Sequence, residues 1–121
     1  MNKDILPLVN LIAKAIYDKK GMNILAMDVS EVASTADVVV IAEGTVDRHV
    51  VAIAREVEGM MDEAGSPPLH TEGRSHGDWI VLDFGVIAVH LFMPEMRRKY
   101  QLERLWSDGK LLELDLGTKV S

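Results

Sequence analysis

Apolar residues near the start of the chain recur at the spacing of one helix face. Pro7 is tolerated near the beginning of a helix, and Gly21, after two lysines, is a typical stop signal. We therefore predict a first helix between them. The residues that follow the i, i+3, i+4, i+7, i+8 pattern are Leu8, Leu11, Ile12, Ala15 and Ile16.

Two apolar runs follow this helix and predict strands. Residues 24–29 form the first run, and residues 31–35 are a polar connection. After Asp37, residues 38–42 are continuously apolar and mostly β-branched, which is typical of a central strand covered on both faces.

A second helical series begins after the turn at Gly44 and Thr45. Threonine is a good N-cap, so we predict that Thr45 caps this helix and that Gly65 ends it. The residues that repeat at helical spacing are Val50, Ala54, Val57, Met61 and Ala64. A strand on either side of this helix favours a right-handed β–α–β crossover.

The second half of the chain predicts a hairpin. Residues 79–84 and 86–92 are strand-like runs separated by Gly85, and residues 69–71 predict a shorter strand before them. The last strand of the hairpin has two faces that alternate along the chain. One carries Val86, Ala88, His90 and Phe92, and the other carries Ile87, Val89 and Leu91.

The C-terminal part is less regular. Residues 95–106 have helical propensity with an irregular middle, residues 111–116 predict an edge strand, and residues 117–121 predict a frayed tail. The resulting order α-β-β-α-β-β-β-α-β predicts an α/β (mixed α+β) fold, with a single mixed β-sheet flanked by helices. We expect one domain over residues 1–121.

Composition narrows the class of protein. Hydrophobic residues make up 48% of the chain, enough for a packed core, and the absence of cysteine excludes disulfides and thiolate chemistry. No apolar run is long enough to span a membrane, and the N-terminus does not lead into a signal-peptide pattern, so we expect a cytoplasmic protein. The net charge of −6 disfavours broad nucleic-acid binding; it favours a basic protein partner, or it only keeps the chain soluble.

Candidate catalytic groups are few. Gly44 and Thr45 could cradle a phosphate at a helix start, but there is no glycine-rich P-loop, and a plain helix cap is the simpler interpretation. Asp78 and Asp83 are an odd number of residues apart and point to opposite faces of a strand, which excludes a shared metal site. The four histidines match no zinc pattern. We therefore expect no enzyme activity, metal or cofactor.

Aromatic residues gather in one part of the sequence. Aromatics are only 5% of the chain, yet Trp79, Phe92, Tyr100 and Trp106 all fall in or beside residues 92–106. Trp, Tyr, Met and Arg are enriched at the centres of protein interfaces. The alternative is that these residues belong to the core, and composition alone does not separate the two.

Four blocks in this order resemble the Iojap family of ribosomal silencing factors. The blocks are residues 35–50 (TADVVVIAEGTVDRHV), residues 77–85 (GDWIVLDFG) running into 89–92 (VHLF), the segment 92–106, and within it the pattern Arg97-x-x-Tyr100-x-Leu102-Glu103-x-Leu105-Trp106. The resemblance implies a nucleotidyltransferase-like fold without transferase activity. It also implies that the protein binds the large ribosomal subunit through ribosomal protein L-fourteen and blocks joining of the small subunit when nutrients are scarce. The absence of a transit peptide favours a bacterial type.

We predict a partner-binding surface that combines this resemblance with the aromatic segment. Trp79, Val81 and Asp83 share a strand face, which predicts an aromatic anchor with an acidic rim. The predicted contact or contact-shaping residues are Trp79, Asp83, His90, Met93, Pro94, Arg97, Tyr100, Leu102, Leu105 and Trp106. We expect no membrane partner and no sequence-specific nucleic acid.

Two alternatives remain open. One is a residual nucleotidyltransferase-like nucleotide-binding protein that uses Thr45, Asp47 and Asp83. The other is a homodimeric scaffold in which the same apolar patch joins two copies.

Overall fold

The computed structural model describes residues 5–33, 36–104, 106–114 and 116. The predicted tail, residues 117–121, lies outside the described residues. The elements are α1 (Ile5–Asp18), β1 (Met22–Asp28), β2 (Val38–Glu43), α2 (Asp47–Glu63), β3 (His70–Glu72), β4 (Trp79–Asp83), β5 (Ile87–Phe92), α3 (Pro94–Tyr100), the 3-10 helix η1 (Leu102–Arg104) and β6 (Lys110–Leu111).

The strands form one six-stranded mixed sheet in the order β3-β4-β5-β2-β1-β6. Only β2 and β5 pair in parallel, and the other neighbours are antiparallel. The predicted fold class, a single mixed sheet with flanking helices, is confirmed. So is the β4–β5 hairpin, in which Gly85 adopts a φ of 86° that a side chain would disfavour.

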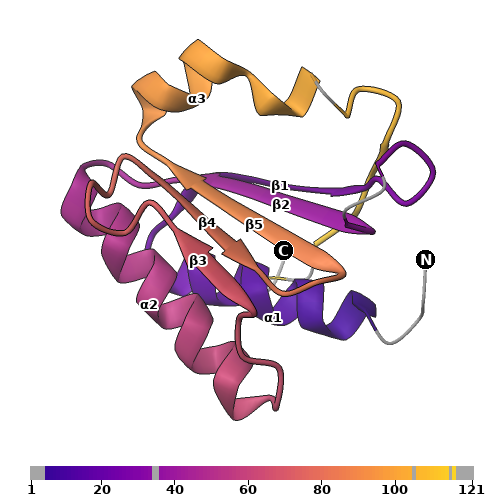
Figure 1. Ribbon diagram of the computed structural model, residues 1–121, viewed down its shortest axis with the longest axis horizontal. Helices are drawn as coiled ribbons and strands as arrows, with labels where there is room; N and C mark the ends of the chain where they lie inside the picture. Colours follow the sequence, from indigo (N-terminus) through magenta and orange to yellow (C-terminus); the bar gives the residue numbers. More distant parts are fainter. Residues whose placement is uncertain (1–4, 34–35, 105, 115, 117–121) are drawn as a thin grey trace, which may run out of the picture.

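Helices α1 and α2 pack side by side on one face of the sheet (Figure 1). The two predicted helical series supply their buried faces, and alternate strand residues such as Val40, Leu82 and Val89 meet them with no exposed surface. This side of the sheet is a continuous apolar core. Its burial is the main source of stability in a domain of this size.

Helix α3 and the segment after it cover part of the opposite face (Figure 1). A second, smaller core lies there, in which Val39, Ile41 and Phe92 are buried. Partly buried side chains pack against this core: Leu25, Ala33, Trp79, Met96, Leu102 and Trp106. Helix α3 itself has no fully buried residue, so it covers this face loosely.

Three local predictions are wrong. Val46, not Thr45, is the N-cap residue of α2, because the Thr45 side chain turns toward His49. The helix predicted over residues 95–106 ends at Tyr100, since Gln101 adopts a left-handed φ of 47° and its N–H donates to the Arg97 carbonyl oxygen. The last strand is only Lys110–Leu111, where it pairs with the end of β1.

The β–α–β crossover also differs from the prediction. The strand after α2 is β3, which lies at the edge of the sheet, and the parallel partner of β2 is β5. Burial explains the arrangement: β3 is short and both His70 and Glu72 are exposed, whereas β5 has an apolar residue at five of its six positions. The more apolar strand takes the central place.

Candidate protein-docking site

Trp79, His90, Tyr100 and Trp106 come together on the α3 side of the sheet. The Trp79 ring centroid lies 5.0 Å from that of Tyr100 and 6.1 Å from that of His90, and the His90 and Trp106 centroids are 6.0 Å apart. These separations are typical of offset or tilted ring contacts. We call these four side chains the aromatic cluster.

Strand alternation explains why the cluster forms. On β4, Ile80 and Leu82 are fully buried toward the two large helices, so Trp79, Val81 and Asp83 face the other way, as predicted. The β4–β5 register places Trp79 opposite Phe92 and Val81 opposite His90. As this register requires, the ring centroids of Trp79 and Phe92 are 5.1 Å apart.

His90 is neutral in this environment. The Trp79 Nε1–H donates to His90 Nδ1 at 3.2 Å, and burial lowers the pKa of His90 from 6.5 to about 4. The cluster therefore carries no charge near pH 7. Tyr100 is its most accessible member, with 45% of its surface exposed.

Arg97 lies inside the protein rather than on its surface. Its Nη1 donates to Glu43 Oε2 at 3.0 Å and to the Asn23 carbonyl oxygen at 2.6 Å, and its Nε lies 3.4 Å from Glu103 Oε1. The side chains of Arg97 and Glu43 are only 12% and 11% exposed. Arg97 thus ties α3 to the ends of β1 and β2.

The other predicted site residues are distributed around this arrangement. Met93 and Pro94 are partly buried at the start of α3, and Leu102 packs on the second core. Asp83 lies at the opposite end of β4 from Trp79, where its Oδ1 accepts the Gly85 N–H at 2.8 Å. Asp83 therefore stabilises the hairpin turn. Leu105 lies outside the described residues.

The backbone N–H groups of the turn at Gly44 and Thr45 are already hydrogen-bonded within the protein. The Gly44 N–H donates to the Phe92 carbonyl oxygen at 2.9 Å, and the Thr45 N–H donates to His49 Nδ1 at 2.8 Å. His49 Nε2 lies 2.7 Å from the Lys19 carbonyl oxygen, so the proton is on Nε2. These two N–H groups are not available to a phosphate.

The residues proposed for nucleotide transfer do not meet. Thr45 and Asp47 follow β2 at its carboxyl end, level with Phe92, whereas Asp83 pairs with Ala88. Four residues of strand separate the two levels, about 13 Å. The structure therefore does not bring Thr45, Asp47 and Asp83 together in one site. Within the described residues, no group of three histidine, cysteine, aspartate or glutamate side chains is placed to hold a metal ion.

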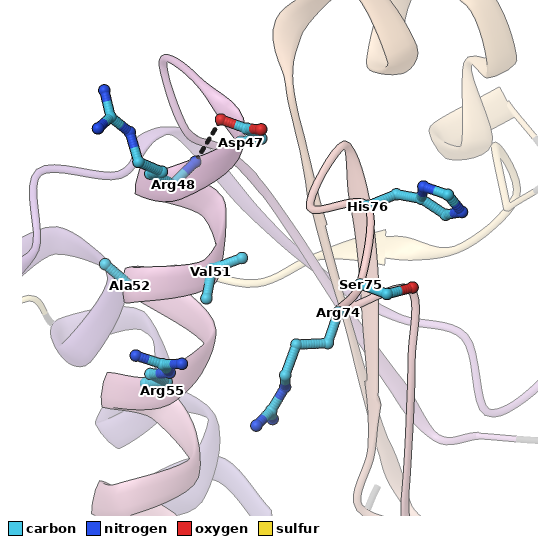
Figure 2. A pocket seen from close by; sticks show the side chains of 8 residues that line it. All are labelled: Asp47, Arg48, Val51, Ala52, Arg55, Arg74, Ser75 and His76. Atoms are coloured by element: carbon cyan, nitrogen blue, oxygen red, sulfur yellow. Dashed lines mark hydrogen bonds between the residues drawn. The ribbon is translucent and has the colours of Figure 1, made fainter.

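The sequence did not predict the Glu43–Arg97 ion pair, because its partners are 54 residues apart and nothing local links them. Nor did it predict a cleft beside α2 lined by Arg48, Arg55 and Arg74, shown in Figure 2. The seven-residue spacing of Arg48 and Arg55 on one helix was the available signal.

In the described parts of the chain, no helix is long and apolar enough to cross a membrane.

The chain is similar to known proteins over nearly its whole length. Residues 2–120 match the family model described as "Ribosomal silencing factor during starvation". A "Ribosomal silencing factor RsfS" of Bacillus subtilis is 37% identical over 110 residues, which cover 91% of this chain and 93% of that protein.

More distant and structural relatives agree. The chloroplastic Iojap protein of Zea mays is 24% identical over 108 residues, which cover 89% of this chain and 47% of that protein. A crystal structure of a Chromobacterium violaceum protein superposes with a TM-score of 0.83 at 32% identity, and 88% of each chain is covered. The resemblance to the Iojap family is confirmed, and the chain belongs to the family of ribosomal silencing factors.

Proposed function

We propose that this protein represses translation by binding the large ribosomal subunit through ribosomal protein L-fourteen and sterically blocking the small subunit. The family supplies the ribosomal context. The observation that carries the docking surface is the aromatic cluster, which lies on the sheet face that α3 and the segment after it partly cover. Nothing in this mechanism requires a chemical step.

The composition of this face supports a protein partner. Trp79 and Tyr100 are in ring contact, and Tyr100 remains 45% exposed, so a partner that covers it buries aromatic surface without disrupting the core. Tryptophan and tyrosine dominate interface hot spots because they bury a large area at low entropic cost. A specific contact of this kind covers roughly 1,200–2,000 Å² in total.

The charge of the protein supports a basic partner. With a net charge of −6, the protein is attracted electrostatically to a basic ribosomal protein, which raises the association rate. His90 stays neutral on this face because of its low pKa, so His90 itself adds no buried charge that would oppose docking.

The experiment combines binding with a joining assay. Purified protein is mixed with separated large subunits and with isolated ribosomal protein L-fourteen, and subunit joining is followed by light scattering. Binding to both, with joining blocked, is expected. Absence of binding to either by the folded protein would contradict the proposal.

Trp79→Ala tests the anchor. Removal of the indole should weaken binding to isolated ribosomal protein L-fourteen by about 2 kcal/mol or more. Trp79→Phe, which keeps a ring beside Tyr100, should lose less. The unfolding midpoint of each variant must be measured, because Trp79 also packs on the second core. Full affinity in a folded Trp79→Ala protein would reject Trp79 as an anchor.

A further inference from the structure

A cleft of about 330 Å³ lies between helix α2 and residues 73–77, away from the aromatic cluster (Figure 2). Arg48 and Arg55 line it from the helix, and Arg74 and His76 line it from the loop. The loop packs closely against the helix: a Cβ added at Gly77 would lie only 3.0 Å from the Asp47 carbonyl oxygen. We call this feature the basic cleft.

Two of the three arginines of the cleft are available for a ligand. Arg74 pairs with Glu58. Arg48 and Arg55 are exposed, and within the described part of the chain neither has an acidic side chain at ion-pair distance. Asp47 and Glu58 only partly offset the three positive charges, so the cleft attracts anions although the whole chain is acidic.

The spacing of the arginines favours a polymer over a small anion. Arg48 and Arg55 are seven residues apart on α2, about 10 Å along the helix axis. This exceeds one nucleotide step, so the two side chains would contact different phosphates of one backbone. The lining offers only Val51 and Ala52 as apolar groups, and His76 is the one ring among the lining residues on which a nucleobase could stack.

The position of the cleft links it to the docking surface. Residues 73–77 lead directly into Trp79, and the Met93 N–H at the start of α3 donates to the Asp78 carbonyl oxygen. Helices α2 and α3 both begin at the carboxyl ends of the parallel strands β2 and β5, so they share one end of the molecule (Figure 1). A large partner at this end would reach both features.

We infer that the basic cleft binds phosphate groups of ribosomal RNA beside the protein-docking surface, without reading sequence. This inference rests on the proposed function. Phosphate contacts of this kind position a protein and add affinity, while a separate surface supplies specificity. The acidic remainder of the chain would keep other RNA away.

The first test does not depend on the ribosome. Isotope-labelled protein is titrated with a short RNA duplex at low salt, and amide shifts are recorded by nuclear magnetic resonance. Shifts confined to residues 47–55 and 73–77, absent in Arg48→Gln/Arg55→Gln, are expected. No shift there would overturn the inference. Equal shifts with micromolar inorganic phosphate or a mononucleotide would also overturn it, in favour of a small-anion site.

The second test uses large subunits and separates the two proposals. Arg48→Gln/Arg55→Gln should lower affinity for the subunit roughly 20-fold at physiological salt and reduce the slope of log affinity against log salt by about 2. Its affinity for isolated ribosomal protein L-fourteen should be unchanged. The charge-matched control is Lys19→Gln/Lys20→Gln, at exposed positions after α1, which should leave both affinities unchanged.

The possible outcomes differ for the two ideas. Unchanged subunit affinity and salt slope in the arginine variant would overturn the RNA contact and leave the protein contact intact. Equal loss of affinity for the isolated ribosomal protein would assign the arginines to that protein, which also overturns the RNA contact. If the unaltered protein binds neither subunit nor ribosomal protein, the proposed function fails, and the RNA titration then decides the cleft.

Discussion

The two faces of the sheet differ in what covers them. On the α1–α2 face, β1, β2, β4 and β5 contribute alternate apolar side chains to a single core, and the β4 and β5 residues on this face have no exposed surface. On the α3 face, a short helix without a fully buried residue lies over rings that are partly accessible. The same period-two alternation thus produces one face for stability and one suited to contact.

The polar groups of the two faces differ as well. In the α1–α2 core all the clustered side chains are apolar. The α3 face contains the Glu43–Arg97 ion pair and a neutral histidine bonded to an indole. Polar groups of this kind fix one arrangement of a loosely packed element, at some cost in desolvation. Variants on each face should therefore have different consequences.

The largest effect should come from a truncation on the α1–α2 face. Ile53 is fully buried on α2, and Ile53→Ala removes three carbons and leaves a cavity. The free energy of unfolding should fall by about 2–5 kcal/mol, as measured by urea denaturation. The folded fraction should still bind ribosomal protein L-fourteen normally. A binding defect in protein that remains folded would show that the two faces are not separable.

A smaller effect is expected at the ion pair on the α3 face. Arg97→Met leaves Glu43 without its cation and should lower the free energy of unfolding by about 2 kcal/mol. Binding should weaken as well, because α3 loses its attachment. Glu43→Gln/Arg97→Met is the control: with the charge removed, it should be more stable than Arg97→Met alone. Equal stability of the two variants would contradict a role for the pair.

The smallest effect concerns pH. His90 has a pKa of about 4 in the folded protein and 6.5 in the unfolded chain. As the pH falls below 6.5, His90 is therefore protonated in the unfolded chain while it is still neutral in the folded protein, which favours unfolding. Stability is complete above pH 6.5 and falls toward pH 4, with a loss of about 1 kcal/mol between pH 7.5 and 5.5. His90→Gln should remove that part of the loss. A His90 ring that titrates near pH 6.5 by nuclear magnetic resonance would contradict the burial.

Periodicity predicted most of this fold from particular residues. The run after Asp37 identified the central strand, and alternation on residues 79–92 placed Trp79 and His90 on one face. The family resemblance supplied the ribosomal context on which the proposed function rests. Periodicity is reliable here because a continuous core requires it.

The features that the sequence did not reveal depend on distant partners. Thr45 has good capping chemistry, but His49 competes for its hydroxyl and its N–H. Gln101 ends α3 in a left-handed conformation usually left to glycine or asparagine, so no local signal marked it. Arginine is a residue type that is enriched at interfaces, yet the ion pair with Glu43 keeps most of the Arg97 side chain buried. Which of the possible contacts each of these residues makes depends on the folded structure around it.

We propose that the α3 face docks on the ribosome, and a matched pair of tyrosine variants tests this proposal. Tyr100, in the aromatic cluster, and Tyr17 are 45% and 44% exposed, and their helices, α3 and α1, lie on opposite faces of the sheet (Figure 1). Subunit joining is measured with increasing amounts of Tyr100→Ala or Tyr17→Ala protein. The account predicts that Tyr17→Ala blocks joining like the unaltered protein and that Tyr100→Ala needs a much higher concentration. Equal potency of the two variants, or a defect only in Tyr17→Ala, would contradict it.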